Sequence, residues 1–333
     1  MKKRGFLNSS VIGLGFGNSH AKIIKKNLNS KLDYICDKKI KFKDLAKKLK
    51  CKFTNDSSIA ISNKSTKLIT IASFDNYHFS QIKRCIKMKK HIFVEKPFCQ
   101  NFKKYKFIKN LISKSNLYFS TNLVLRNHPK FKKIKELVNK KKLGKIYHIE
   151  GDYNYGRLYK LLYGWRGKIP FYSVTQGGGI HIIDLMIWIL NSTPKDVFAI
   201  GNKISTNKSN FKHLDNVTGL INFKNGVTGK VTSNFGSVMP HDHQMRIFGT
   251  KGSLNLSHDK ITFFSSRKPK KKNLSIKFNK DKNYKQKILD SFINSIVLKK
   301  KFRLILKKDI FASMSTCLAI DKSLKTKKKE IVK

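Results

Sequence analysis

The chain of 333 residues is long enough for about two domains, each with its own core. Its hydrophobic share of 40% and aromatic share of 11% indicate a folded globular protein and exclude a largely disordered one. The net charge of +53 suggests nucleic-acid binding, but only eight of the 72 basic residues are arginine, the side chain that best recognises bases and phosphates. Because the lysines are spread along the chain, we interpret the charge as solvated surface and expect no nucleic-acid partner.

Five cysteines occur without a C-x-x-C motif or an even framework, which favours free thiols in a reducing cytoplasm and predicts no metal cluster. The basic N-terminus and the apolar stretch after it could mimic a signal peptide, but glycines and Asn18 interrupt that stretch, so we predict no export. The longest apolar run, residues 185–190, is too short to cross a bilayer, so no membrane partner is expected.

The first predicted strand runs into a glycine turn. An apolar stretch leads to Gly13, and Gly15 and Gly17 follow before a helix-like segment. A phosphate cradle requires this order, because a Cβ would block the turn and keep backbone N–H groups away from a pyrophosphate. The spacing departs from G-x-G-x-x-G, whose third glycine is replaced by Asn18. We predict that all four residues bind a cofactor.

The second predicted strand, residues 32–36, ends in Asp37. This aspartate lies 20 residues past Gly17, where a dinucleotide-binding fold places an acid that accepts hydrogen bonds from ribose hydroxyls. A carboxylate there repels a 2′-phosphate, which favours NAD. Lys38 and Lys39 follow at once and keep NADP open as the alternative.

Strands and helices continue to alternate up to about residue 122. The segments that follow are expected as helices at 40–49, 80–89 and 103–115 and as strands at 51–54, 68–72, 91–94 and 117–121. The alternation predicts an α/β domain with a doubly wound parallel sheet over residues 1–122. The polar turn after strand 68–72 lies at the sheet edge that holds ligands, so Ser73, Asn76 and His78 are candidate cofactor contacts.

Glu95, Lys96 and Pro97 directly follow the strand at 91–94. A lysine at this sheet edge lies where a cofactor enzyme needs a cation beside a developing alkoxide, and desolvation there lowers its pKa. We predict that Glu95 and Lys96 contact the cofactor and that Lys96 is catalytic. The alternative is an ordinary loop lysine in a lysine-rich chain.

Four features point to one family: the glycine turn, Asp37, the polar turn ending in His78, and Glu95-Lys96-Pro97. Together they resemble the Gfo/Idh/MocA family of nicotinamide-dependent oxidoreductases. Its common G-x-G-x-x-G-x-x-H pattern matches if one residue is missing before Gly17, which puts His20 in the place of the family histidine. The resemblance implies a Rossmann domain followed, over residues 123–333, by an α+β domain with an open, mainly antiparallel sheet. It also implies that Lys96 lies near the nicotinamide and the reacting hydroxyl.

The second part of the chain is expected to contain strands in series at 146–155, 197–204, 217–223, 227–233, 244–248 and 253–256. Helices are expected at 130–139 before these strands and at 284–297 and 308–324 after them. Strands in series favour an antiparallel sheet. The basic run 267–272 is predicted to be an exposed loop.

Three glycines open an apolar helix in which His181 and Asp184 share one face. The family commonly reads D-x-G-x-H-x-x-D here, and its histidine acts as acid and base. Gly177 replaces the first aspartate of that pattern. The resemblance therefore implies catalytic roles for His181 and Asp184, either with Asp184 orienting the imidazole or with Lys96 carrying more of the proton transfer. The alternative is a histidine packed in the first turn of a buried helix.

Candidate substrate contacts combine aromatic rings, which stack on sugar C–H surfaces, with arginines, which bind phosphate or carboxylate. They are Arg126, Tyr155, Arg157, Trp165, Arg166 and Tyr172, together with His181. His241 and His243 could line the same cleft but are expected in a surface loop. The sequence contains no metal-ligand pattern, so no metal is expected.

We therefore predict a cytoplasmic NAD-dependent oxidoreductase that oxidises a ring hydroxyl of a sugar, polyol or nucleotide-linked sugar, in surface polysaccharide sugar metabolism. One alternative is a redox-neutral enzyme that oxidises its substrate transiently, eliminates and re-reduces it. Another is a non-catalytic NAD sensor or a nucleic-acid-binding protein. The expected partners are a small-molecule sugar and further copies of the chain, since this family often forms dimers or tetramers through its open sheet.

Overall fold

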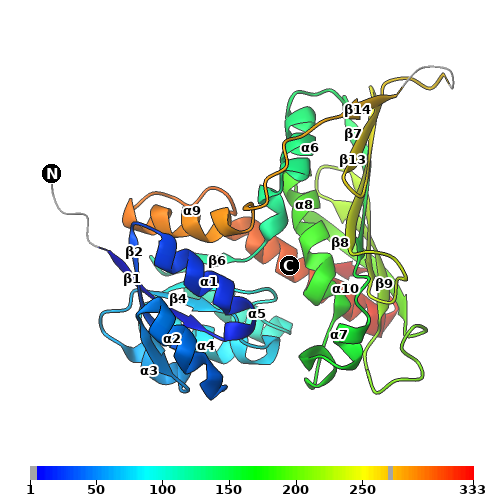
Figure 1. Ribbon diagram of the computed structural model, residues 1–333. Coiled ribbons are helices and arrows are strands. Elements are labelled where there is room, and N and C mark those ends of the chain that lie inside the picture. Colours follow the sequence, from blue (N-terminus) through cyan, green and yellow to red (C-terminus); the bar gives the residue numbers. More distant parts are fainter. Residues whose placement is uncertain (1–5, 269–272) are drawn as a thin grey trace. The chain divides into compact units, whose positions relative to one another are not determined.

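The computed structural model describes residues 6–268 and 273–333 (Figure 1). The described chain divides into two compact units. The first holds the residues up to Val124 together with Asn283–Lys307, and the second holds those from Leu125 to Lys282 together with Lys308–Lys333. Residues 269–272 of the basic run predicted as an exposed loop lie outside the described residues.

The first unit is built on a parallel sheet whose described strands lie in the order β3-β2-β1-β4-β5-β6. The strands are β1 (Leu7–Ile12), β2 (Ser30–Cys36), β3 (Lys52–Thr54), β4 (Leu68–Ile71), β5 (His91–Val94) and β6 (Phe119–Thr121). Every pair is parallel, and the central strand β4 is buried at all its positions. The strand order reverses between β1 and β4, the point at which such sheets bind ligands. The predicted doubly wound sheet is confirmed.

The helices of this unit form two groups around the sheet. They are α1 (Leu14–Lys26), α2 (Lys43–Leu49), α3 (Ser57–Ser62), α4 (Asp75–Lys87), α5 (Phe102–Ser113) and α9 (Gln286–Val297). Helix α1 contacts α2 and α9, whereas α4 contacts α3 and α5. Helices α1, α5 and α9 each bury an apolar stripe, and the parallel strands between the two groups are largely buried.

Helix α9 comes from late in the chain yet packs in the first unit. The ring of its Phe292 lies 5.5 Å from that of Phe93 in β5, and Asn27 donates a 3.0 Å hydrogen bond to Asp290. The division expected after residue 122 differs from the structure in this respect. The physical reason is that the apolar stripe of α9 is buried against α1 and β1.

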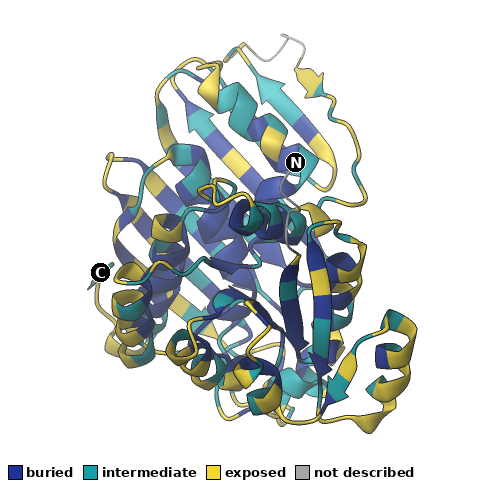
Figure 2. Cartoon of the chain, turned by 90° about the vertical axis from the view of Figure 1, so that its left-hand side faces the viewer, coloured by how far each residue is buried: buried dark blue, intermediate teal, exposed yellow. Residues whose placement is uncertain are grey.

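The second unit contains a larger sheet, whose described strands lie in the order β14-β13-β12-β11-β7-β10-β9-β8-β15. They are β7 (Ile146–Asn154), β8 (Pro194–Asn202), β9 (Asn216–Phe223), β10 (Thr228–Asn234), β11 (Asp242–Gly249), β12 (Ser253–Ser257), β13 (Lys260–Phe264), β14 (Leu274–Ile276) and β15 (Glu330–Ile331). Within the described residues β7 and β10 pair in parallel and the other pairs are antiparallel. Burial alternates along β9 and β10, and Figure 2 shows such bands on the strands. The predicted open, mainly antiparallel sheet is confirmed.

The helices of the second unit are α6 (Pro129–Asn139), α7 (Tyr159–Leu162), α8 (Ile180–Leu190) and α10 (Lys307–Thr326). Helix α8 is buried at nearly every position, which explains its unbroken apolar sequence. A π-helical turn, Thr175–Gly179, leads into it. In the described parts of the chain, no helix is long and apolar enough to cross a membrane.

Candidate active site

The glycine turn after β1 excludes side chains at two of its three glycines. Gly13 has a φ of +84°, and a Cβ there would lie 2.4 Å from the backbone nitrogen of Ser73. A Cβ on Gly17 would lie 2.9 Å from Cγ1 of Val11, so this glycine lets α1 pack closely on β1. At Gly15, by contrast, no described atom lies within 4 Å of the Cβ position. The turn therefore has a tight bend at Gly13, a close contact between α1 and β1 at Gly17, and an accessible backbone at Gly15 between them.

This arrangement fits the phosphates of a dinucleotide. Helix α1 begins at Leu14, so its first N–H groups and its positive end lie beside Gly15. In the usual motif the second glycine is the one that lets the pyrophosphate approach the backbone, and Gly15 has the open space for that approach. The contacts of Gly17 also match the helix-packing role of the third glycine, as expected for a turn shortened by one residue.

Asp37 follows β2 and reaches the glycine turn. Its Oδ2 accepts a 2.7 Å hydrogen bond from the backbone N–H of Leu14, and its Oδ1 accepts one of 2.9 Å from that of Lys39. Each carboxylate oxygen has a second lone pair, so both can still accept from ribose hydroxyls. The bond to Leu14 fixes the carboxylate beside the turn, a contact that spacing alone does not reveal.

Helix α4 begins at Asp75 rather than at residue 80, so Asn76 and His78 lie in its first turn and not in a loop. Ser73 donates a 2.7 Å hydrogen bond to Gln81 Oε1. The Oδ1 atom of Asn76 is buried without a hydrogen-bond partner among the described residues, and the same holds for Oδ1 of Asn18. Buried amide oxygens of this kind fit the hydrogen-bond donors of a ligand.

His78 is fully buried, and both of its ring nitrogens face backbone carbonyls. Nδ1 lies 2.7 Å from the oxygen of Pro97, and Nε2 lies 3.0 Å from that of Ser73. The ring thus joins the turn before α4 to the loop after β5. The structure replaces the expected cofactor contact with a positioning role, because the polar atoms of the ring are directed at the backbone.

Glu95 is held by residues from two other elements. His20 Nε2 lies 3.3 Å from its Oε1, and Asn122 Nδ2 donates to the same oxygen at 2.6 Å. Burial raises the pKa of Glu95, but these contacts, with the nearby charge of Lys96, outweigh it and hold the pKa below its usual value. Glu95 is therefore a fixed anion beside Lys96. No pattern in the sequence pointed to Asn122, because it reaches Glu95 only where the ends of the paired strands β5 and β6 lie side by side.

The candidates for cofactor binding collect at one edge of the parallel sheet. Gly13, Asp37, Ser73 and Glu95 each follow the carboxyl end of a strand, and half-buried Lys96 lies one residue further. In parallel sheets this edge is where ligands bind. The first unit therefore brings together most of the cofactor contacts that the sequence predicts.

In the second unit His181 lies in the first turn of α8 and is 7% exposed. Its ring stacks on Tyr153 of β7, with centroids 6.2 Å apart and an interplanar angle of 17°. Tyr153 also stacks on Tyr155, at 6.1 Å. His241 and His243 meet Tyr153 edge-on, each at 5.1 Å. The expectation of a surface loop is corrected: His243 lies in β11, His241 directly precedes that strand, and both are half-buried because they pack on the ring that supports His181.

An aromatic and cationic surface adjoins this stack. The guanidinium of Arg166 lies 4.7 Å from the ring centre of Trp165 and 5.8 Å from that of Tyr155. Arg157 lies 5.8 Å from the same tyrosine ring. Four of the predicted substrate contacts thus lie together. Ring faces and guanidinium groups can hold the C–H face of a sugar and an anionic substituent.

Gly177 is the position at which the family motif has its first aspartate. A Cβ there would lie 2.2 Å from the hydroxyl oxygen of Tyr172. That oxygen accepts a 3.1 Å hydrogen bond from Nε of Arg166. The sequence indicated the lost acid, but only the fold shows that a phenol fills its place.

Arg126 and Asp184 lie in a buried ion cluster. Nε and Nη2 of Arg126 donate to the two oxygens of Asp184, at 2.8 and 2.6 Å, and Nη1 donates to Asp309 at 2.8 Å. Arg126 is 3% exposed and Asp184 is 1% exposed. Burial opposes the charge of Arg126, but the two carboxylates outweigh it and raise its pKa.

Two predictions are corrected by this cluster. Asp184 was expected to be catalytic and Arg126 to bind substrate, but each satisfies the other in a site that water does not reach. Asp309, which completes the cluster, lies in the first turn of α10, far away in the sequence. The cluster joins α8 and α10 to the turn at Val124–Asn127 and is structural.

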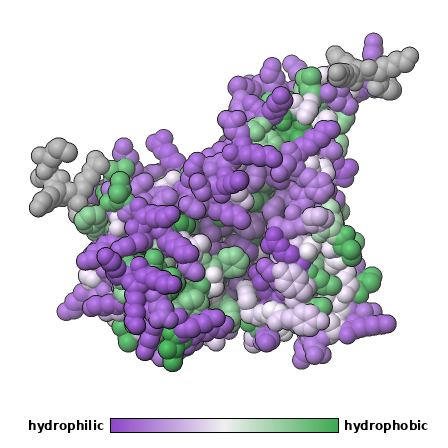
Figure 3. Space-filling view, in the orientation of Figure 1, coloured by the Kyte–Doolittle hydropathy of each residue, from purple (hydrophilic) through white to green (hydrophobic). Residues whose placement is uncertain are grey.

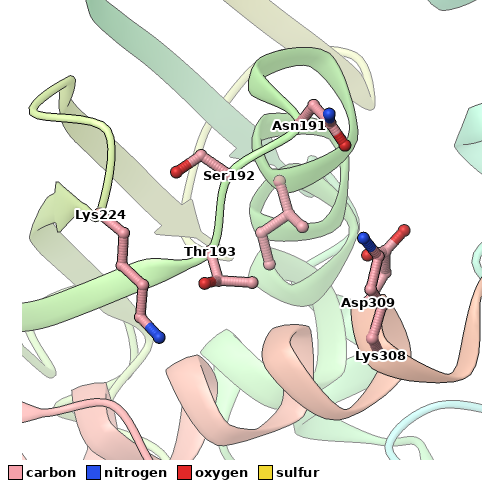
Figure 4. A pocket seen from close by; sticks show the side chains of 7 residues that line it. Asn191, Ser192, Thr193, Lys224, Lys308 and Asp309 are labelled. Atoms are coloured by element: carbon pink, nitrogen blue, oxygen red, sulfur yellow. The ribbon is translucent and has the colours of Figure 1, made fainter.

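A cavity of 270 Å³ lies at the other end of α8 (Figure 4). It is lined by Ile187, Asn191, Ser192, Thr193, Lys224, Lys308 and Asp309. None of the predicted catalytic residues lines it. Nowhere in the described ranges do three or more histidine, cysteine or acidic side chains form a group that could hold a metal ion.

Two family models match the chain. One, described as "Oxidoreductase family, NAD-binding Rossmann fold", matches residues 7–123, and the other, described as "GFO/IDH/MocA C-terminal domain", matches residues 131–255. A myo-inositol 2-dehydrogenase of Thermotoga maritima is 25% identical, over 73% of this chain and 73% of its own length. A 2,7-anhydro-N-acetylneuraminate hydratase of Escherichia coli is 22% identical, over 75% of this chain and 67% of its own.

Solved structures share the fold of the whole chain. A scyllo-inositol dehydrogenase from Lactobacillus casei, with bound NAD(H) and scyllo-inositol, has a TM-score of 0.81 at 19% identity and covers 98% of this chain and 99% of its own. The two family models adjoin along the sequence, and their domain order matches the two sheets described above. The chain therefore belongs to the Gfo/Idh/MocA family of oxidoreductases, whose N-terminal domain is an NAD-binding Rossmann fold.

Proposed function

We propose that this oxidoreductase oxidises a ring hydroxyl of a sugar, polyol or nucleotide-linked sugar with NAD. The main support is the surface beside His181, where a base stands next to stacked aromatic rings and two arginines. The relatives named for inositol oxidation act on cyclic polyols, which suits such a surface. If the substrate is a nucleotide-linked sugar, we propose that the enzyme acts in the cytoplasm. Its role would then be in surface polysaccharide sugar metabolism.

The proposed chemistry assigns separate tasks to the residues of this chain. When bound, NAD supplies the hydride acceptor. Gly15 and Asp37 would hold its pyrophosphate and ribose, and Gly13 would keep the turn tight beside them. His181 takes the proton of the substrate hydroxyl as hydride leaves the same carbon, and Lys96 supplies positive charge for the developing alkoxide.

Two substitutions test these roles. We expect Lys96→Ala and His181→Ala each to lower turnover by about 100-fold or more, because general acid–base groups contribute at least that much. NAD affinity, measured by titration, should stay near that of the unmodified protein. Lys106→Ala and His148→Ala, on exposed and half-buried positions outside the proposed site, are the matched controls. Normal turnover in His181→Ala would refute the proposed reaction, and normal turnover in Lys96→Ala would refute the role proposed for the lysine.

A second candidate is a redox-neutral reaction in which the substrate is oxidised, loses a group and is reduced again. Two observations support this second reaction: position 177 lacks the acid of the family motif, and one relative is named as a hydratase. Absorbance of NADH during turnover separates the two, because net dehydrogenation accumulates NADH and the redox-neutral cycle does not.

We also propose that the chain forms a homodimer or homotetramer. The exposed face of the larger sheet carries apolar side chains at Phe198, Ile200 and Leu220, which are 39%, 61% and 55% exposed. Phe198 and Leu220 lie opposite one another on β8 and β9. An apolar patch of this kind is typical of a protein–protein contact.

A further inference from the structure

We propose that the Tyr172 hydroxyl, held by Arg166, takes the place of the carboxylate missing at Gly177 and positions the proton-transfer site at His181. This inference rests on the proposed function of His181. It makes Tyr172 a positioning residue rather than one more sugar contact. It also explains why this chain has a glycine where the family commonly has an acid.

The geometry carries the proposal. A side chain at position 177 would begin 2.2 Å from the phenol oxygen and 2.6 Å from Cζ of the same ring, so an acid at 177 and the ring of Tyr172 exclude one another. Position 177 lies one turn before His181, where the family acid would face the imidazole. Tyr172 is 3% exposed, so its hydroxyl occupies a defined place in the unit.

Arg166 determines what the phenol can do there. Its Nε donates to the phenol oxygen, so the hydroxyl hydrogen is the donor that the phenol offers in return. The guanidinium is fixed between Trp165 and Tyr155, at 4.7 and 5.8 Å from their ring centres. The phenol is therefore oriented by a charged and well-packed partner.

The replacement changes the electrostatics of the site. A carboxylate at 177 would stabilise a protonated imidazole, whereas a neutral phenol bonded to a guanidinium would not. The titratable groups around His181 within its unit include Tyr153 on β7 and, against Tyr153, the side chains of Tyr155, His241 and His243. The positive charges of Arg157 and Arg166 also act on Tyr153. Burial raises the pKa of Tyr153, so that ring stays neutral. None of the groups named here supplies the negative charge that a carboxylate at position 177 would bring to the imidazole.

The first test is Tyr172→Phe, which keeps the ring and removes the hydroxyl. We expect turnover to fall by about tenfold or more, while NAD affinity and melting temperature stay close to those of the unmodified protein. Tyr163→Phe, at a tyrosine that is 77% exposed in the same region, is the control and should leave turnover unchanged. Full turnover in Tyr172→Phe would overturn the proposal.

The second test moves the acid back. Gly177→Asp alone should lower turnover, because its Cβ meets the phenol. Combined with Tyr172→Ala, which removes the ring, Gly177→Asp should raise turnover above that of Tyr172→Ala alone. The acidic limb of the pH profile of kcat/KM should also move to higher pH than in the unmodified protein, because a carboxylate favours the protonated imidazole. A double variant no more active than Tyr172→Ala, or with an unmoved acidic limb, would refute the replacement.

His181→Ala distinguishes this inference from the function on which it rests. If His181→Ala is inactive and Tyr172→Phe is fully active, the role of Tyr172 is refuted and the proposed function stands. If His181→Ala keeps normal turnover, the proposed function itself fails.

Discussion

Gly13 and Gly15 belong to one turn but are required for different reasons. Gly13 combines a positive φ with backbone atoms of Ala72 and Ser73 within 2.6 Å of its Cβ position. Gly15 lies inside α1 with open space around it. The first glycine thus serves the fold, and the second serves the ligand.

Alanine substitutions separate these two roles. We expect Gly13→Ala to lower the free energy of unfolding by more than about 1 kcal/mol, because alanine is strained at this φ and its Cβ has no room. Gly15→Ala should preserve or raise stability, since alanine is favoured over glycine in a helix by about 1 kcal/mol. It should nevertheless weaken NAD binding, because its methyl group occupies the approach to the helix N-terminus. Thermal denaturation and NAD titration measure both effects, and unchanged NAD affinity in Gly15→Ala would contradict the assigned cradle.

At the scale of elements, α10 supports the turn that precedes α8. Asp321 of α10 accepts hydrogen bonds from Ser173 Oγ at 2.8 Å and from Gln176 Nε2 at 2.6 Å. These two residues lie between Tyr172 and Gly177 in the sequence, so α10 holds the short segment that joins them. Burial raises the pKa of Asp321 from 3.8 to about 6, although both hydrogen bonds act in the other direction.

This shift predicts a pH dependence of stability. Between pH 3.8 and about 6 the folded chain keeps a proton on Asp321 that the unfolded chain has lost, so the contribution of Asp321 to the free energy of unfolding falls as pH rises through this window and levels off above it. Asp321→Asn cannot ionise. Its stability relative to the unmodified protein should therefore rise by about 1 to 3 kcal/mol from pH 4 to pH 6, as measured by urea denaturation. Parallel stability curves for the two proteins would contradict this prediction.

For the whole molecule, the net charge of +53 and the open sheet face act in opposite directions. Figure 3 shows hydrophilic residues spread over the face in view, as expected for lysines distributed along the chain. Like charges repel and oppose self-association, more strongly at low salt. The apolar side chains on β8 and β9 favour association.

Charge placed on the open sheet face tests the proposed assembly. In a two-fold contact the same patch meets itself, so Leu220→Glu combined with Ile200→Glu would bring like charges together. We expect light scattering after size exclusion to give two or four times 38.5 kDa for the unmodified protein and about 38.5 kDa for this variant. Leu28→Glu, at a position 89% exposed in the first unit, is the control. A variant that keeps the mass of the unmodified protein would place the contact elsewhere.

Patterns in the sequence were enough to predict the class of both sheets, the glycine turn with Asp37, and the family. These signals are local: alternation of strands and helices, turn glycines, and short motifs such as Glu95-Lys96-Pro97 are legible along a single stretch of chain. The sequence predicts the start of α4 too late, at residue 80 instead of Asp75, because the polar residues after β4 are typical both of a turn and of the first turn of a helix.

Which polar residues satisfy one another follows only from the contacts of the folded chain. Arg126 pairs with Asp184 and Asp309, and Tyr172 fills the place beside Gly177, through contacts between residues that no local pattern connects. Buried charges and hydroxyls must find partners wherever the chain brings them together, so a motif residue such as Asp184 can be structural. For the same reason a tyrosine outside the motif can stand where an acid is missing.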